Sequence, residues 1–169
     1  YQKPGTYTLK GRDGQITIEL DRDLIPHISA VSHRDLFFGQ GFITAQHRLW
    51  QMDFQNLAVS GRLSEVVGDK TLELDQFQRR FGLSEAARLS GELMMKDSLT
   101  RNVLLAYTEG INQAIEDWPV RQLPIEFKVL DYQPEPWKPE NTGLLLKRMA
   151  YTLSAHSDDK SLSLTLEMF

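Results

Sequence analysis

Apolar and polar residues alternate along the first thirty positions, a pattern typical of strands with one buried face. In the segment 15–20, the apolar side chains of Ile16 and Ile18 alternate with polar ones. Gly14 closes a turn signal just before this segment, because glycine accepts a positive φ. We therefore predict a hairpin followed by a third extended segment. The predicted strands are residues 7–10, 15–20 and 26–30.

Beyond residue 32, apolar residues recur every three or four positions, the spacing of amphipathic helices. Ser32 is a predicted N-cap, and Asp35, three residues later, is a partial capping-box acid. Ser60-Gly61 predicts the end of this first helix, and Asn141 is the predicted cap of the last one. The predicted helical segments are residues 33–60, 63–67, 71–81, 84–95, 99–117 and 143–153.

Glycines interrupt two of these helical patterns. Gly39 and Gly41 lie inside the longest predicted helix, where each costs roughly 1 kcal/mol of helix propensity relative to Ala. We predict that another backbone approaches closely at these two positions. Gly82 is a predicted break between the helices of residues 71–81 and 84–95.

Four prolines make residues 123–140 a predicted extended connector, because proline cannot continue a helix. They are Pro124, Pro134, Pro136 and Pro139. Together, these elements predict a mostly helical α+β chain that forms a single domain over residues 1–169. The predicted strands are too few to form a stable sheet alone. We therefore expect a second chain to supply a larger sheet.

Composition excludes several function classes. The chain of 169 residues has a formal net charge of -4 and no long Lys/Arg cluster, which argues against nucleic acid as a partner. It has no cysteine, which excludes disulfides, thiolate catalysis and cysteine-based zinc sites. No window approaches the roughly 18 apolar residues of a membrane span, so we expect no membrane-spanning segment.

Both ends of the chain indicate processing. The chain starts at Tyr1 without an initiator Met, so we expect that a signal peptide was removed or that the chain was trimmed. The apolar segment 161–169 has no cap or polar tail, so we expect that it was cut or that it continues to pack against a partner. From the first of these expectations we predict a periplasmic or secreted protein.

The residues give little support for a self-contained active site. No two of the four histidines, His27, His33, His47 and His156, are spaced like metal ligands on one helix. The chain also lacks a Gly-x-Ser-x-Gly nucleophile motif and a glycine-rich phosphate loop before a helix. Catalysis by this chain alone therefore has no support in its sequence.

Taken singly, the polar residues have ordinary structural interpretations. We interpret His27 as a hydrogen-bonded core histidine in a strand, and His47 as a structural helix residue that an acid could pair with. Arg62 and Glu65 fit a surface ion pair of little energetic value. Asp158-Asp159 fits a solvated helix cap.

Five short motifs follow one another between residues 21 and 83. They are Asp21-Arg22-Asp23-Leu24-Ile25-Pro26-His27-Ile28-Ser29-Ala30, Asp35-Leu36-Phe37-Phe38-Gly39-Gln40-Gly41-Phe42, Ala45-Gln46-His47-Arg48-Leu49-Trp50-Gln51-Met52-Asp53, Ser60-Gly61-Arg62-Leu63-Ser64-Glu65-Val66-Val67-Gly68, and Asp75 with Arg79-Arg80-Phe81-Gly82-Leu83. Their order and spacing resemble the start of the small subunit in the penicillin acylase family. The chain departs from that pattern at Leu24-Ile25, where Gly-Val is usual, and at His47, where Asp is usual.

The resemblance implies an N-terminal-nucleophile hydrolase, in which a precursor cuts itself into a small and a large subunit that stay together. The large subunit then begins with a Ser whose hydroxyl attacks an amide carbonyl, while its own α-amino group acts as the base. The oxyanion hole also lies on the large subunit. The implied architecture is an αββα four-layer sandwich, which would supply the larger sheet expected above.

The resemblance further assigns two sites to this chain. The last helix would line the acyl pocket through Met149, Thr152 and Leu153; phenylacetyl-specific members of the family have Arg and Phe at the two later positions. Asp159, or Asp158 if the alignment shifts by one, would give one carboxylate to a structural calcium ion. Because calcium takes six to eight oxygen ligands, the large subunit would supply most of them.

Two functions from different classes remain open at this point. The first is a subunit of an amide hydrolase that acts on a small acyl amide, such as a β-lactam side-chain amide, an N-acyl homoserine lactone or another acylated amine. The second is a non-catalytic, free-standing helical interaction domain. A tight companion chain that begins with Ser would favour the first, and a monomeric, cooperatively folded chain the second.

Overall fold

The computed structural model describes residues 4–119, 123–154 and 159–167 of the chain. Among these residues, three antiparallel strands form one small sheet in the order β1 (Gly5–Lys10), β2 (Gln15–Leu20) and β3 (Pro26–Ser29). Ile16 and Ile18 of β2 are fully buried, whereas the alternating Gln15, Thr17 and Glu19 are not. The alternation in the sequence therefore predicted both the strands and their buried face.

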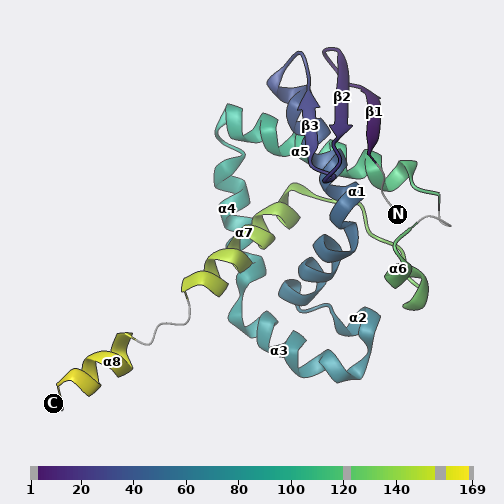
Figure 1. The fold of residues 1–169 in the computed structure, drawn as a ribbon. Helices are drawn as coiled ribbons and strands as arrows, with labels where there is room; N and C mark the ends of the chain where they lie inside the picture. Colours follow the sequence, from purple (N-terminus) through teal and green to yellow (C-terminus); the bar gives the residue numbers. More distant parts are fainter. Residues whose placement is uncertain (1–3, 120–122, 155–158, 168–169) are drawn as a thin grey trace.

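One long helix, α1 (His33–Ser60), covers the inner face of the sheet (Figure 1). Ser32 is its N-cap, as predicted: its backbone is extended and its hydroxyl oxygen accepts a hydrogen bond from the N–H of Asp35. Gly61 ends the helix in the left-handed conformation, with φ of 67°. The helix thereby carries the chain from the sheet to the opposite end of the molecule.

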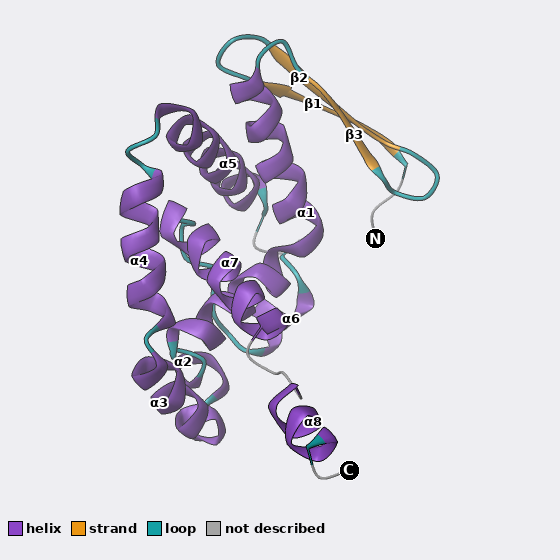
Figure 2. Cartoon of the chain, turned by 90° about the vertical axis from the view of Figure 1, so that its left-hand side faces the viewer, coloured by secondary structure: helices purple, strands orange, loops and turns teal. Residues whose placement is uncertain are grey.

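The helices that follow α1 are α2 (Ser64–Val67), a 3₁₀ turn η1 (Asp69–Thr71), α3 (Leu72–Phe81), α4 (Leu83–Met94), α5 (Ser98–Asp117), α6 (Ile125–Val129), α7 (Pro139–Ser154) and α8 (Asp159–Leu166). Helices α3, α4, α5 and α7 pack against α1, and α8 lies apart from this bundle (Figure 2). The predicted mostly helical α+β class is confirmed. Gly82 separates α3 from α4 as predicted, with a φ of 79°.

The closest helix pair is α1 and α5, which cross at two glycines. A Cβ atom built on Gly41 would overlap the carbonyl oxygen of Tyr107, and one built on Gly110 would overlap the carbonyl oxygen of Phe38. The close backbone approach predicted at Gly41 is therefore confirmed. At Gly39 the prediction is wrong, because the atoms nearest to an added Cβ belong to the side chains of Ile16 and Ile28 of the sheet and not to a backbone.

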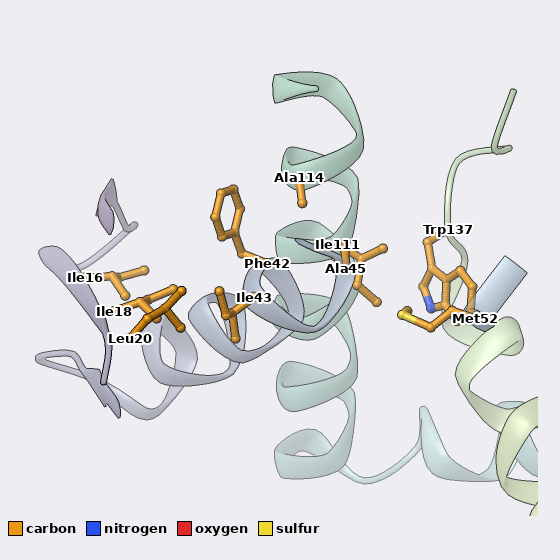
Figure 3. Close-up of a cluster of buried hydrophobic side chains, with 10 residues drawn as sticks. All are labelled: Ile16, Ile18, Leu20, Phe42, Ile43, Ala45, Met52, Ile111, Ala114 and Trp137. Atoms are coloured by element: carbon orange, nitrogen blue, oxygen red, sulfur yellow. The ribbon is translucent and has the colours of Figure 1, made fainter. Parts of the chain in front are cut away.

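The main hydrophobic core lies between the sheet and this helix pair. Figure 3 shows the apolar face of β2 on one side, with Phe42 and Ile43 of α1 next to it and Ile111 of α5 beyond them. Trp137, from the segment that precedes α7, closes the far end of the same cluster. Residues from four separate parts of the chain are thus held in one core.

The predicted extended connector at residues 123–140 is wrong in part. Helix α6 follows Pro124 directly, and α7 begins at Pro139, because proline is well tolerated in the first turn of a helix. Asn141 consequently lies inside α7 and does not precede it. Its side-chain oxygen instead accepts a hydrogen bond of 2.7 Å from the backbone N–H of Lys138, just before the helix.

Two further expectations about single residues need correction. Asp35 does not complete a capping box, because its carboxylate accepts hydrogen bonds from the backbone N–H groups of the β1–β2 turn. His27 is not a core residue: its side chain is 62% exposed and lies 3.1 Å from Asp21. The physical reason is the strand alternation, which points the neighbouring Ile28 inward and His27 outward.

Candidate functional site

The C-terminal half of α7 presents an exposed apolar face. Met149 is 60% exposed and Leu153 is 76% exposed, and Thr152 is exposed as well. Spacings of three and four residues place all three side chains on one side of the helix. The structure therefore brings together the three predicted pocket residues, on a part of α7 that leads away from the core toward α8 (Figure 1).

The other end of α7 is fixed by side-chain amides. The amide of Asn112 on α5 makes two hydrogen bonds with the backbone of Trp137: it accepts from the N–H at 2.7 Å and donates to the carbonyl oxygen at 3.0 Å. The amide of Asn141 in the first turn of α7 donates to the side-chain oxygen of Asn56 on α1 at 3.1 Å. These contacts set where α7 starts, relative to α1 and α5.

A second set of side chains fastens the segment between α6 and α7 to the end of α1. The hydroxyl of Tyr132 donates to the carboxylate of Asp53 at 2.7 Å. The guanidinium of Arg62 bridges the carboxylates of Glu65 and Glu135, so the predicted Arg62–Glu65 ion pair is confirmed and extended. A polar cavity of about 120 Å³ lies beside this network, between α1 and residues 135–141.

Burial and charge act in opposite directions on the acids of this network. Burial raises the pKa of Asp53, although the hydrogen bond from Tyr132 opposes that rise. The hydrogen bonds from Arg62 lower the pKa of Glu135. The network therefore holds Arg62 between the carboxylates of Glu65 and Glu135, and burial makes the neighbouring Asp53 harder to ionise than a carboxyl group in water.

Two buried acids in the motifs between residues 21 and 83 serve turns and do not face solvent. Asp35 is 1% exposed and Asp75 is 2% exposed. Asp75 accepts hydrogen bonds from the backbone N–H groups of Leu63 and Ser64, at 3.0 and 2.7 Å. Burial alone would raise the pKa of Asp75, but hydrogen bonds from Ser64 and Leu63 more than compensate and lower it. These carboxylates hold the scaffold in shape.

The histidines do not assemble a catalytic group among the described residues. The Nε2 atom of His47 is buried, and within the described part of the chain it has no hydrogen-bond partner. Burial lowers the pKa of His47. The acid that could pair with His47 is therefore not found at this nitrogen, and His156 lies outside the described residues.

The two predicted metal ligands fall at the edge of what the structure describes. Asp158 lies outside the described residues. Asp159 is the first residue of α8, but its side chain is not among those described. Within the described part of the chain, no group of three or more His, Asp or Glu side chains could hold a metal ion. The calcium assignment stays a prediction.

Comparison with known proteins identifies the family. The penicillin amidase family model matches residues 15–168, which is nearly the whole chain. The chain belongs to the penicillin amidase family.

Within the described residues, no helix combines the length and apolarity that crossing a bilayer requires.

The relatives found within this family are acylases. The chain is 29% identical over 151 residues to the penicillin acylase 2 proenzyme of Pseudomonas sp. (strain SE83), and 30% identical over 164 residues to the acyl-homoserine lactone acylase QuiP of Pseudomonas aeruginosa. These alignments cover 89% and 96% of this chain but only 19% of each relative. The chain thus spans about a fifth of the length of the relatives it matches.

A solved structure shares the fold. It is a thermostable penicillin G acylase from Alcaligenes faecalis, with a TM-score of 0.68 and 24% sequence identity. The match covers 96% of this chain and 81% of the solved chain. The arrangement of α1, α5 and α7 described above is therefore a fold already found in a penicillin G acylase.

The anchors of α7 were missed by sequence reasoning. They are the side-chain amides of Asn112 on α5 and Asn56 on α1. Nothing in their local sequence indicates a hydrogen bond to residues 137 and 141, because those partners lie 25 and 85 positions away. A side-chain amide inside an otherwise apolar helix face was the available signal, since such a group needs a partner when it is buried.

Proposed function

We propose that this chain is the small, non-catalytic subunit of a two-chain amide hydrolase. In this proposal the nucleophile is the N-terminal Ser of a large partner subunit from the same precursor. Family membership supports amide hydrolysis as the reaction class, and the chain's share of its relatives' length supports a larger partner. The observation that carries the proposal is the exposed apolar face of α7.

Helices α3, α4 and α7 carry further exposed apolar side chains. They are Phe77 and Phe81 of α3, Leu89 and Leu93 of α4, and Leu146 of α7. Covering apolar surface contributes roughly 25 cal/mol per Å², so a partner that packs here would gain much of its binding energy from these residues. We propose that the large subunit covers this surface.

The proposed role of α7 is to form one wall of the acyl pocket. Met149, Thr152 and Leu153 would contact the acyl chain, and the Ser of the large subunit would attack the amide carbonyl. A wall with Thr152 and Leu153 has neither an aromatic ring nor a cation, which favours an aliphatic acyl group over a phenylacetyl group. The proposed substrates are acyl amides, with N-acyl homoserine lactones and β-lactam side-chain amides as the two candidates.

We further propose a structural calcium ion shared between the two subunits, with Asp159, or else Asp158, as the ligand from this chain. A carboxylate oxygen is the type of ligand that calcium prefers. The ion would brace the interface next to α7. Elemental analysis of the purified two-chain protein should find one calcium ion per complex, and Asp159→Ala should remove it and lower the thermal midpoint. Full calcium content in both Asp→Ala variants would contradict this assignment.

The subunit arrangement can be tested directly. Expression of the full-length gene, followed by intact-mass analysis and N-terminal sequencing, should yield this chain together with a larger chain that begins with Ser. The complex should hydrolyse acyl amides, and this chain alone should not. A stable monomer without a companion would instead support the free-standing helical interaction domain. Cell fractionation of the same culture tests the proposed periplasmic or secreted location.

The pocket assignment has its own matched test. Leu153→Ala in the complex should change the preferred acyl length, because it shortens an apolar side chain of the proposed wall that is 76% exposed. Leu99→Ala is the control, since Leu99 is similarly exposed at 66% but lies at the start of α5. Equal acyl preferences for both variants and the wild type would show that α7 does not line the pocket.

A further inference from the structure

The two ends of α7 are held by different kinds of contact. Its N-terminal end has the amide hydrogen bonds from Asn56 and Asn112 described above. In the middle, Leu144 is buried in a small cluster with Val59 and Ala87. The last two turns lie beyond these anchors, and they carry the proposed pocket residues.

An aromatic contact supports the last turn of α7 from the side. The ring of Phe81 lies 4.6 Å from the ring of Tyr151, centroid to centroid, with an angle of 57° between the planes. Phe77 stacks on Phe81 as well, with ring centroids 5.8 Å apart. Tyr151 directly precedes Thr152, so a shift of its ring would displace the proposed pocket face.

The platform that carries Phe81 is itself fixed to the scaffold. Arg79 of α3 donates a hydrogen bond of 2.7 Å to the carbonyl oxygen of Gly61, at the end of α1. One turn earlier, the buried carboxylate of Asp75 holds the backbone that follows Gly61. Gly82 then ends α3 immediately after Phe81. Phe81 is thus a fixed point against which Tyr151 rests.

We propose that Phe81 is a positioning residue for acyl specificity, which acts through Tyr151 on the pocket face of α7. The inference rests on the proposed function, because it takes Met149, Thr152 and Leu153 as the acyl wall. Phe81 would not touch the acyl chain. It sets how far the last turn of α7 leans into the pocket, and so which acyl lengths fit.

The test uses the two-chain complex and two substrates, a hexanoyl and a dodecanoyl amide of the same amine. Phe81→Leu should change the ratio of kcat/KM between the two substrates about two- to tenfold, the range expected for the loss of one aromatic pair. The change should fall on KM, because the reacting groups lie on the other subunit. Phe81→Tyr keeps a ring at this position and should retain the wild-type ratio.

Tyr151→Leu removes the other half of the contact and should shift the ratio in the same direction. The double variant should shift it no further, because both changes remove one interaction. If Phe81→Leu fails to fold, Tyr151→Leu and Phe81→Tyr still decide the question. An unchanged ratio in Tyr151→Leu, or a double variant with fully additive shifts, overturns the inference.

Leu153→Ala separates this inference from the proposal on which it rests. If Leu153→Ala shifts the ratio and Phe81→Leu does not, α7 lines the pocket but Phe81 does not position it. If neither variant shifts the ratio, the pocket assignment itself is wrong. Both outcomes overturn the role of Phe81, but only the second also overturns the assignment of α7 to the acyl pocket.

Discussion

Replacing Gly41 by Ala tests whether the contact between α1 and α5 is as close as described. The added Cβ would overlap the carbonyl oxygen of Tyr107 and lie only 2.9 Å from its carbonyl carbon, whereas real Cβ contacts are not shorter than 3.0 Å. Both neighbours are backbone atoms of a helix, so no side chain can rotate away. The two helices must therefore separate by about 1 Å, a gap that forfeits up to half of the dispersion energy of the contacting atoms.

The expected cost follows from two opposing contributions. Overpacking of this kind costs about 3 kcal/mol, the upper end of the usual range, because the obstacle is backbone. Replacing Gly by Ala in a helix interior returns about 1 kcal/mol. The net loss of about 2 kcal/mol corresponds to a fall in thermal midpoint of about 4–8 °C for a unit of 150–250 residues, and to a smaller fall where a larger assembly unfolds as one unit.

Gly91 provides the matched control within the same chain. It lies inside α4, and a Cβ built on it would meet no atom within 4 Å. Gly91→Ala should therefore raise the stability by about 0.5–1 kcal/mol through helix propensity alone. Thermal unfolding of both variants, followed by circular dichroism or calorimetry in the assembled protein, gives the comparison. A Gly41→Ala variant as stable as Gly91→Ala would refute the close backbone approach.

Three further substitutions test the polar contacts, each by thermal unfolding. Asp35→Asn should lower the free energy of unfolding by about 2–3 kcal/mol, because an amide has one acceptor oxygen for the three N–H groups that the carboxylate now serves. Asn112→Asp should cost about 1–3 kcal/mol and speed amide exchange in residues 132–138, because the carboxylate cannot donate to the carbonyl oxygen of Trp137. Because folding raises the pKa of Asp53, the contribution of Asp53 to the free energy of unfolding should decrease as pH rises from about 4 through that raised pKa. Asp53→Asn should lose this pH dependence. It should be at least as stable as the wild type at pH 7, because the amide oxygen can still accept the hydrogen bond from Tyr132. The free energy of unfolding of the wild type relative to Asp53→Asn should therefore fall as pH rises. A relative stability that rises with pH would contradict the raised pKa of Asp53.

Much of the fold could be predicted because its signals are local. The strand of residues 15–20 and the N-cap at Ser32 rest on patterns within a few residues, and both are confirmed. The same holds for the helix end at Gly61. The close approach at Gly41 was also predictable, since glycine in a helix interior costs stability unless its missing side chain serves a purpose.

The predictions failed where a side chain serves a distant segment. Asp35 has the position of a capping-box acid, but the β1–β2 turn lies close enough to take all of its hydrogen-bonding capacity. The prolines of residues 123–140 were interpreted as helix breakers, although two of them immediately precede or start a helix. Such outcomes depend on the folded arrangement and not on sequence spacing.

In the candidate site, too, the local feature could be predicted from the sequence and the long-range contact could not. The shared face of Met149, Thr152 and Leu153 follows from helix periodicity, and the structure places these residues together on an exposed surface. The contact between Phe81 and Tyr151 could not be predicted, because these residues are 70 positions apart and no local pattern indicates that α3 and α7 meet there.

The hydrogen bonds and buried contacts of α7 are concentrated in its N-terminal half, which has a consequence for how this protein can evolve. The residues that keep the helix in place, such as Asn112 and Trp137, are remote from the exposed turn that carries Leu153. Substitutions in that turn remove few buried contacts, so they carry a small penalty in folding free energy. A lineage can therefore sample new side chains at positions 149, 152 and 153 while the framework stays intact. If these positions line the acyl pocket as proposed, substrate preference and foldability are inherited through largely separate sets of positions.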